Sequence, residues 1–248
     1  MWPRRDAVCW IGAVLAAVCG AASSAAMQWI ATNFYSAALN RNALYEIMLP
    51  DGYGPSNPVP VLYLLHGRGD YAHTWRVEAA GIITNALRNR HVALVFPDGD
   101  NSWYQGNYWR RYISTDLTHH VELAWHVIGR RGIGGYDMGG YGALYVGSIG
   151  EAYDHVAYRS VSAMSGAFVE PGVPQTLGDL GGPILGRNDL ADAVAPRAFV
   201  LLFDCGNEDT GALYGMPAYN LAAKNDTLRA ALVNRGRTLW RNLFYYRP

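Results

Sequence analysis

The chain has 248 residues, half of them apolar, with 20 basic and 20 acidic residues and a formal net charge of zero. This size and apolar content fit one α/β domain with a substantial core better than two small domains. The balanced charge, with no long run of either sign, argues against a nucleic-acid partner. No cofactor fingerprint is visible, and no metal site is expected.

Residues 1–26 differ from the rest of the chain. They carry arginines at positions 4 and 5, an uncharged apolar stretch from Ala7, and small residues up to Ala26. This pattern predicts a secretory signal, with residues 27–248 as the mature domain, a secreted or periplasmic location and no stable membrane insertion after cleavage. An uncleaved membrane anchor is the alternative, because no charge occurs between Asp6 and Arg41.

Short apolar runs rich in β-forming residues alternate with longer segments of helical spacing. The short runs predict strands at Ala43–Leu49, Val59–Leu65, His91–Phe96, Gly132–Tyr136, Tyr158–Met164, Ala198–Phe203 and Leu239–Tyr246. The longer segments predict helices at Thr74–Arg90, Ser114–Gly129, Met138–Ile149 and Leu228–Arg235. This alternation predicts an α/β fold with a mostly parallel central sheet and helices on both faces. Val169–Ala195, rich in Gly and Pro, is expected to form a lid-like excursion.

The segment GGYDMGGYGAL, residues 134–144, predicts a strand that turns sharply into a helix, with Asp137 at the apex of the turn. Such a turn presents a nucleophile in a strained backbone conformation and needs small neighbours two residues away on each side. Gly135 and Gly139 meet that need. The backbone N–H of Met138, at the start of the helix, is then placed to stabilise an oxyanion.

Five segments, VPVLYLLHGRGDYAHTW, ALVFPDGDNSWYQG, ISTDL, GIGGYDMGGYGALYVG and FDCGNED, follow one another in the order and approximate spacing of a known family. Over residues 36–248 the chain resembles the esterase family of the α/β-hydrolase superfamily that includes S-formylglutathione hydrolase (esterase D) and the mycobacterial mycolyltransferases. The resemblance implies acyl transfer on esters or thioesters by a serine, an acid and a histidine, with a small-molecule ester or acyl substrate. It also implies that Arg68 supplies the second oxyanion N–H and that Asp209 is the acid.

Two departures from the family pattern affect catalysis. Asp137 stands where the family has serine, and the family's last Gly-Gly-His-Asp-Trp segment has no counterpart before the chain ends at Pro248, so the chain is expected to be truncated there. No histidine follows His155. The leading expectation is therefore a hydrolase or acyltransferase scaffold with impaired catalysis. Two alternatives stay open: a non-catalytic pseudoenzyme that binds an ester, lipid or sugar, and an Asp-nucleophile hydrolase of the dehalogenase or epoxide-hydrolase kind.

The same segments also contain a group of aromatic residues and a histidine whose roles are to be assigned. An aromatic group that follows a predicted strand end is a candidate for substrate binding, with core packing as the commoner use of such residues: Trp103, Tyr104, Tyr108 and Trp109. His66 is expected to be a hydrogen-bonded turn histidine, because the resemblance assigns the oxyanion donor to the backbone beyond it. The acyl group, the acceptor and the oligomeric state are left open by the sequence.

Overall fold

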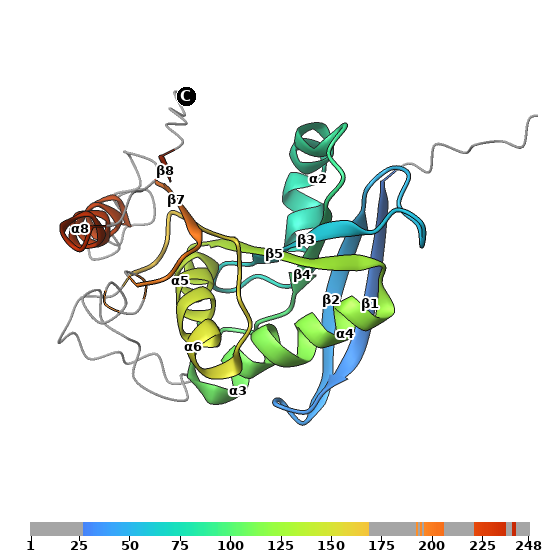
Figure 1. Cartoon of the computed structure of the whole chain (residues 1–248), viewed down its shortest axis with the longest axis horizontal. Coiled ribbons are helices and arrows are strands. Elements are labelled where there is room, and N and C mark those ends of the chain that lie inside the picture. The colour runs from blue at the N-terminus through green and yellow to red at the C-terminus, as the bar shows by residue number, and fades with distance from the viewer. Residues whose placement is uncertain are drawn as a thin grey trace, which may run out of the picture.

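The computed structural model of the chain describes residues 27–168, 192, 194, 196–205, 221–236 and 240–241 (Figure 1). The predicted signal at 1–26, the acid Asp209 and nearly all of the predicted excursion Val169–Ala195 lie outside these residues. In the described part, no helix combines the length and apolarity needed to cross a bilayer.

One twisted sheet organises the described residues (Figure 1). Its order is β1-β2-β4-β3-β5-β6-β7-β8. The first two strands pair antiparallel with each other, β2 also pairs antiparallel with β4, and every other neighbouring pair is parallel. The strands are β1 Gln28–Ser36, β2 Arg41–Leu49, β3 Val59–Leu65, β4 Ala93–Pro97, β5 Val127–Tyr136, β6 Ser160–Met164, β7 Val200–Asp204 and β8 Trp240–Arg241. The mostly parallel sheet predicted from the alternating pattern is confirmed.

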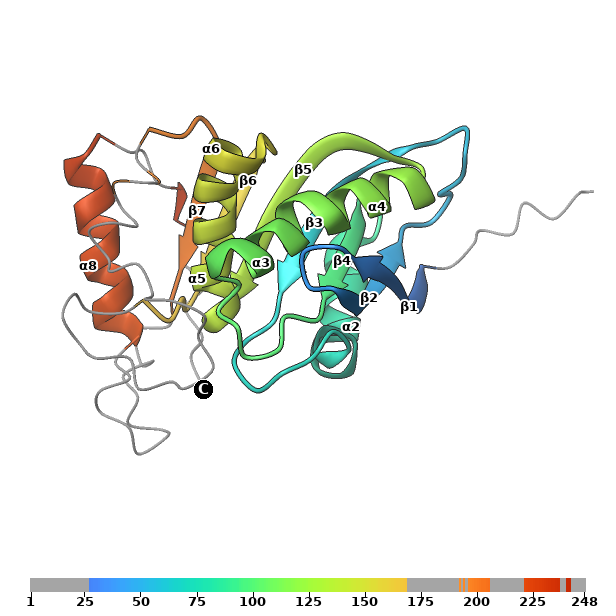
Figure 2. The same ribbon diagram turned by 90° about the horizontal axis from the view of Figure 1, so that it is seen from below.

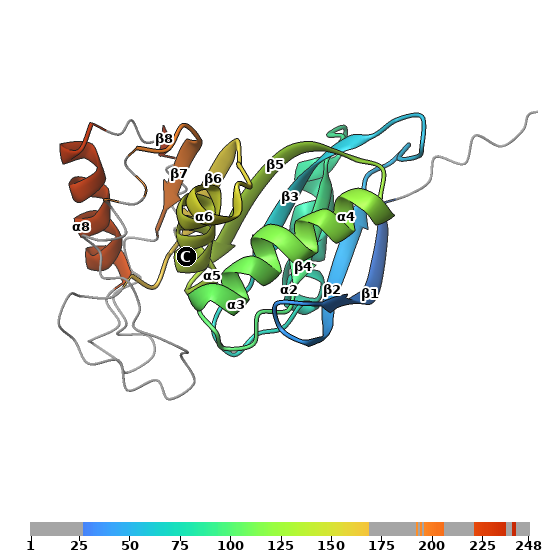
Figure 3. The ribbon, with the colours of Figure 1, turned by 60° about the horizontal axis from the view of Figure 1, so that its bottom comes forward.

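Helices cover both faces of this sheet (Figures 1 and 2). They are α2 Thr74–Leu87, α3 Gly106–Arg111, the π-helical segment η1 Tyr112–Leu117, α4 Thr118–Ala124, α5 Met138–Tyr145, η2 Val146–Gly150, α6 Glu151–Asp154 and α8 Leu221–Asn234. Ile83 of α2 packs with side chains from one face of β2, β3 and β4. Alternate residues of the same strands point to the other face. There they pack with side chains from α3, η1, α4 and α5 in the larger core (Figure 3).

The observed elements correct the predicted ones at several places. The helix expected at Leu228–Arg235 begins earlier, at Leu221, and ends at Asn234. The helix expected at Ser114–Gly129 begins at Gly106 and ends at Ala124, and residues 127–129 belong to β5. Backbone pairing explains this end, because the Val59 N–H donates to His126 and draws the segment into the sheet. Strand β1 was not predicted, since its mixed polar sequence at an edge lacks the apolar run of a central strand. Only Trp240–Arg241 of the expected last strand is described.

Candidate active site

Asp137 lies at the apex of a sharp turn between β5 and α5. Its φ and ψ are 52° and −119°, a region that residues with a side chain rarely adopt. The Asp137 N–H donates to the Met164 carbonyl at 3.2 Å, and the Asp137 carbonyl accepts from Gly140 at 3.1 Å and Ala167 at 2.9 Å. These bonds tie the turn to β6 and to the next loop, and so hold the strained conformation. The turn has the form that the glycine pattern predicted.

The two glycines that flank the turn occupy space that no side chain can share. A Cβ on Gly135 would lie 2.4 Å from the Gly139 carbonyl oxygen, and one on Gly139 would lie 2.4 Å from the Leu65 oxygen and 2.6 Å from the His66 oxygen. The obstructing atoms are backbone atoms, which cannot swing aside. Strand β3 and the first turn of α5 therefore approach each other as closely as they do only because both positions are glycine.

The loop after β3 brings the backbone of Arg68 to the apex of the turn. The Arg68 N–H donates to Asp137 Oδ2 at 2.9 Å. The two residues after this amide hold the loop in place, because the Gly69 N–H donates to Asn101 Oδ1 at 2.7 Å and the Tyr136 hydroxyl donates to Asp70. The amide expected to bind an oxyanion is thus bonded to the chain's own carboxylate.

Burial raises the pKa of the Asp137 carboxyl above its usual value. The backbone N–H groups of Arg68 and Met138 oppose this and lower the pKa, whereas the nearby charge of Asp70 raises it further. The second carboxylate oxygen, Oδ1, is buried and has no hydrogen-bond partner among the described residues. The two oxygens of one carboxylate therefore differ: one is anchored by an amide and the other is unpaired.

None of the seven histidines, all of which lie within the described range 27–168, hydrogen-bonds Asp137. His66 is the nearest in sequence to the loop, but both of its ring nitrogens are engaged. Its Nε2 accepts the Gly99 N–H at 2.8 Å, so its Nδ1 carries the proton and donates to the Gly67 carbonyl at 2.7 Å. His66 is a turn histidine, as expected from the sequence, and offers no base to Asp137.

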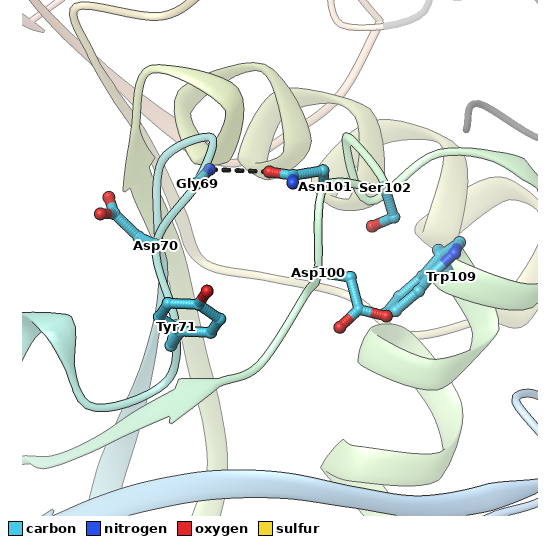
Figure 4. A pocket seen from close by; sticks show the side chains of 7 residues that line it. All are labelled: Gly69, Asp70, Tyr71, Asp100, Asn101, Ser102 and Trp109. Atoms are coloured by element: carbon cyan, nitrogen blue, oxygen red, sulfur yellow. Dashed lines mark hydrogen bonds between the residues drawn. The ribbon is translucent and has the colours of Figure 1, made fainter. Parts of the chain in front are cut away.

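A pocket of about 370 Å³ opens one residue beyond Arg68 (Figure 4). Its walls come from the loop after β3 and the loop after β4, which the bond between Gly69 and Asn101 bridges (Figure 4). Tyr71 and Trp109 supply the aromatic surface of the pocket. Of its two acids, Asp100 is paired with Arg41 at 2.7 Å, and Asp70 accepts a hydrogen bond from the Tyr136 hydroxyl. Such a lining of aromatic rings and polar groups suits a small organic ligand.

Trp103 and Tyr104 are core residues. Trp103 is 4% exposed and packs edge-on against Tyr141, and Tyr104 is fully buried, with its hydroxyl accepting the His66 N–H at 3.1 Å. Both residues also have positive φ. The pocket instead uses Trp109, a member of the same predicted aromatic group, together with Tyr71, which the sequence pattern did not single out. No group of three or more His, Cys, Asp or Glu in the described ranges is arranged to hold a metal ion.

Replacing Asp137 by glycine is expected to stabilise the fold at neutral pH by about 1–2 kcal/mol, because glycine adopts this φ and ψ without strain. Asp137→Asn, which removes the charge but keeps the strain, is the matched control. Since the carboxyl pKa is raised in the folded state, wild-type stability falls as pH rises from the usual value of 3.8 through the raised pKa. Thermal unfolding should show the advantage of both variants growing over that interval. An advantage that is constant with pH would contradict the assignment of a buried carboxyl.

Comparison with known proteins assigns the chain to a family. Residues 36–229 match the sequence model of the family described as "Putative esterase". An esterase of Mycobacterium tuberculosis (strain ATCC 25618 / H37Rv) is 27% identical over 168 residues, a match that covers 60% of this chain. The same match spans only 37% of that relative's length.

Solved structures share the fold. A ferulic acid esterase superposes with a TM-score of 0.69 at 21% identity, over 87% of this chain and 88% of the other. The S-formylglutathione hydrolase of Staphylococcus aureus superposes with a TM-score of 0.60 at 18% identity, over 85% of this chain and 99% of the other. These likenesses confirm the α/β-hydrolase fold expected from the sequence. The chain belongs to this esterase family and has the scaffold of an esterase-like hydrolase or acyltransferase.

Proposed function

We propose that this protein is an esterase-family scaffold that binds a small ester or acyl ligand beside the β5–α5 turn and hydrolyses it weakly or not at all. The observation that carries the proposal is the 2.9 Å bond from the Arg68 N–H to Asp137 Oδ2. An oxyanion donor stabilises the transition state of acyl transfer only when it is free to meet the developing charge. Here the donor is already engaged by a carboxylate of the same chain.

The chemistry of Asp137 supports the same proposal. A carboxylate that attacks an ester gives an anhydride, which is a high-energy acyl donor and readily reverts. The raised pKa also leaves less of this carboxyl ionised under mildly acidic conditions than an exposed aspartate would be. Ester cleavage through position 137 is therefore disfavoured both by the product it would form and by the charge it needs.

The test is the hydrolysis of 4-nitrophenyl acetate by the purified chain, compared with a heat-denatured sample. The rate is expected to stay within about two-fold of the denatured control, because no described group activates a nucleophile at the turn. Asp137→Asn, which has nearly the same volume, serves as the matched variant. A wild-type rate well above the control that Asp137→Asn abolishes would show that Asp137 turns the ester over.

A second candidate function is an Asp-nucleophile hydrolase, and the buried, unpaired Asp137 Oδ1 favours it. This oxygen can attack an alkyl carbon: the O–C bond forms, the carbon–halogen bond breaks, and the halide leaves with the electron pair. Release of the resulting alkyl ester needs a base to activate water. Because no histidine contacts Asp137, the reaction is expected to stop at the ester. Mass spectrometry after incubation with 1-bromobutane should show one butyl group at Asp137, and an unmodified chain would exclude this function.

Export is part of the proposal. Export is supported by the arginine pair and by the apolar, small-residue run in residues 1–26. Residues 27–248 would then form the mature domain. The N-terminal sequence of protein recovered from the periplasm or medium of a bacterial host tests it. A start near Met27 supports cleavage, whereas a full-length chain in the membrane fraction supports the anchor.

A further inference from the structure

A second cavity lies away from Asp137, toward the opposite ends of the central parallel strands. It is a groove of about 550 Å³ lined by residues from the first half of β3, the middle of β5 and the start of β6. Along β5, Arg131 and Asp137 are six residues apart, which corresponds to about 20 Å of extended strand. The groove is therefore separate from the pocket beside Arg68.

The floor of the groove is made by Gly132 and its neighbours across the sheet. Gly132 pairs with Leu62 on one side and with Ser160 on the other. A Cβ at position 132 would lie 2.7 Å from Ser160 Oγ and 3.0 Å from Leu62 Cδ1, so the absence of a side chain leaves the hollow open. Pro60, Leu62 and Val92 add an apolar wall.

The polar side chains of the groove are hydrogen-bond donors. Three arginines line it, and no acidic residue does. Arg131 is paired with Glu122, with contacts of 2.5 and 2.8 Å. Arg130 and Arg159 are exposed and have no acidic partner among the described residues. Two guanidinium groups are thus available to a ligand beside an apolar surface.

The two cavities differ in the charged residues that line them, in a chain whose net charge is zero. The pocket beside Arg68 has two aspartates and no basic residue in its lining, whereas the groove has three arginines and no acid. Ligands of different charge are therefore expected to bind in the pocket beside Arg68 and in the groove. A neutral ligand suits the first, where Asp100 is already paired with Arg41, and an anion suits the second.

We propose that the groove over Gly132 binds an amphiphilic anion, in which a carboxylate or phosphate head meets Arg130 and Arg159 and an apolar body lies over Leu62 and Val92. The planar guanidinium forks offer paired donors to such a head group. The hollow over Gly132 accommodates the part of the body next to it. This site is independent of the function proposed for Asp137.

Calorimetric titration of the full chain with octanoate and with octyl phosphate tests the proposal, with octyl glucoside as the neutral ligand of equal chain length. Binding of at least one anion is expected, together with no measurable binding of octyl glucoside at the same concentrations. Arg130→Ala and Arg159→Ala should each weaken the binding about ten-fold, because each removes a charged donor pair. Comparing the two anions distinguishes a carboxylate ligand from a phosphate ligand.

Two matched variants locate the effect. Arg229→Ala removes an exposed arginine on α8 that pairs with Asp226 and does not line the groove, so it should leave the affinity unchanged. Asp137→Asn should also leave the affinity of the groove unchanged, since Asp137 follows the C-terminal end of β5 and does not line the groove. The proposal is overturned if octyl glucoside binds as tightly as the anions, if neither anion binds, or if Arg229→Ala weakens binding as much as Arg159→Ala does.

Discussion

Asp137→Ser alone is expected to leave ester hydrolysis within about ten-fold of wild type and roughly four to six powers of ten below a complete serine–histidine–acid enzyme. The substitution frees the Arg68 N–H and supplies the hydroxyl that the family uses. It supplies no base, and none of the seven histidines, all within 27–168, contacts position 137. A serine hydroxyl without an adjacent base is a poor nucleophile.

Asp137→Ala is the matched control for this variant, because it frees the same amide but has no hydroxyl. Initial rates of the two variants on one chromogenic ester should agree within error, which assigns any gain over wild type to the vacated Arg68 N–H. A serine variant more than a hundred-fold faster than the alanine variant would contradict the expectation. It would show that a base reaches position 137, and the pH dependence of that rate would give the pKa of the base.

The backbone of the site was predictable from the sequence, and its side-chain contacts were not. The turn at Asp137 follows from glycines two residues away on each side, a local requirement that a sequence displays directly. That the Asp137 carboxylate bonds the Arg68 amide depends on a side-chain rotamer and on a loop 69 residues away in the chain. The hydrogen bond from the Gly69 N–H to Asn101 Oδ1 depends on a second loop, the one after β4. No local pattern encodes either contact.

Trp103 and Tyr104 also show that side-chain contacts could not be predicted from the sequence. Their position after a strand end indicated a pocket, but both rings are buried in the core. The space for Tyr104 is provided by Gly99 and Gly142, where a Cβ would lie 2.2 and 2.5 Å from the ring. Gly142 lies 38 residues beyond the tyrosine that it accommodates. Burial of this ring therefore depends on packing between distant segments, which the order of residues does not display.

Gly139→Ala is expected to destabilise the fold by about 3 kcal/mol or more, because steric overpacking usually costs about 1–3 kcal/mol and here the clash is with backbone. The new Cβ would lie 2.4 Å from the Leu65 oxygen and 2.6 Å from the His66 oxygen. Relief requires α5 to move away from β3, which also lengthens the bond from Arg68 to Asp137. For a domain of this size the melting temperature should fall by roughly 6–12 °C.

Gly81→Ala is the control for the same chemical change in a place with room. Gly81 lies within α2, and a Cβ there would meet nothing within 4 Å. Alanine has the higher helix propensity, so this variant is expected to be more stable than wild type by about 0.5–1 kcal/mol. Opposite signs for the two variants would show that close approach, and not glycine's flexibility, is what position 139 requires. If Gly139→Ala melted at the wild-type temperature, β3 and α5 would not be in the contact described, and the Arg68 amide would not be fixed at Asp137 by that packing.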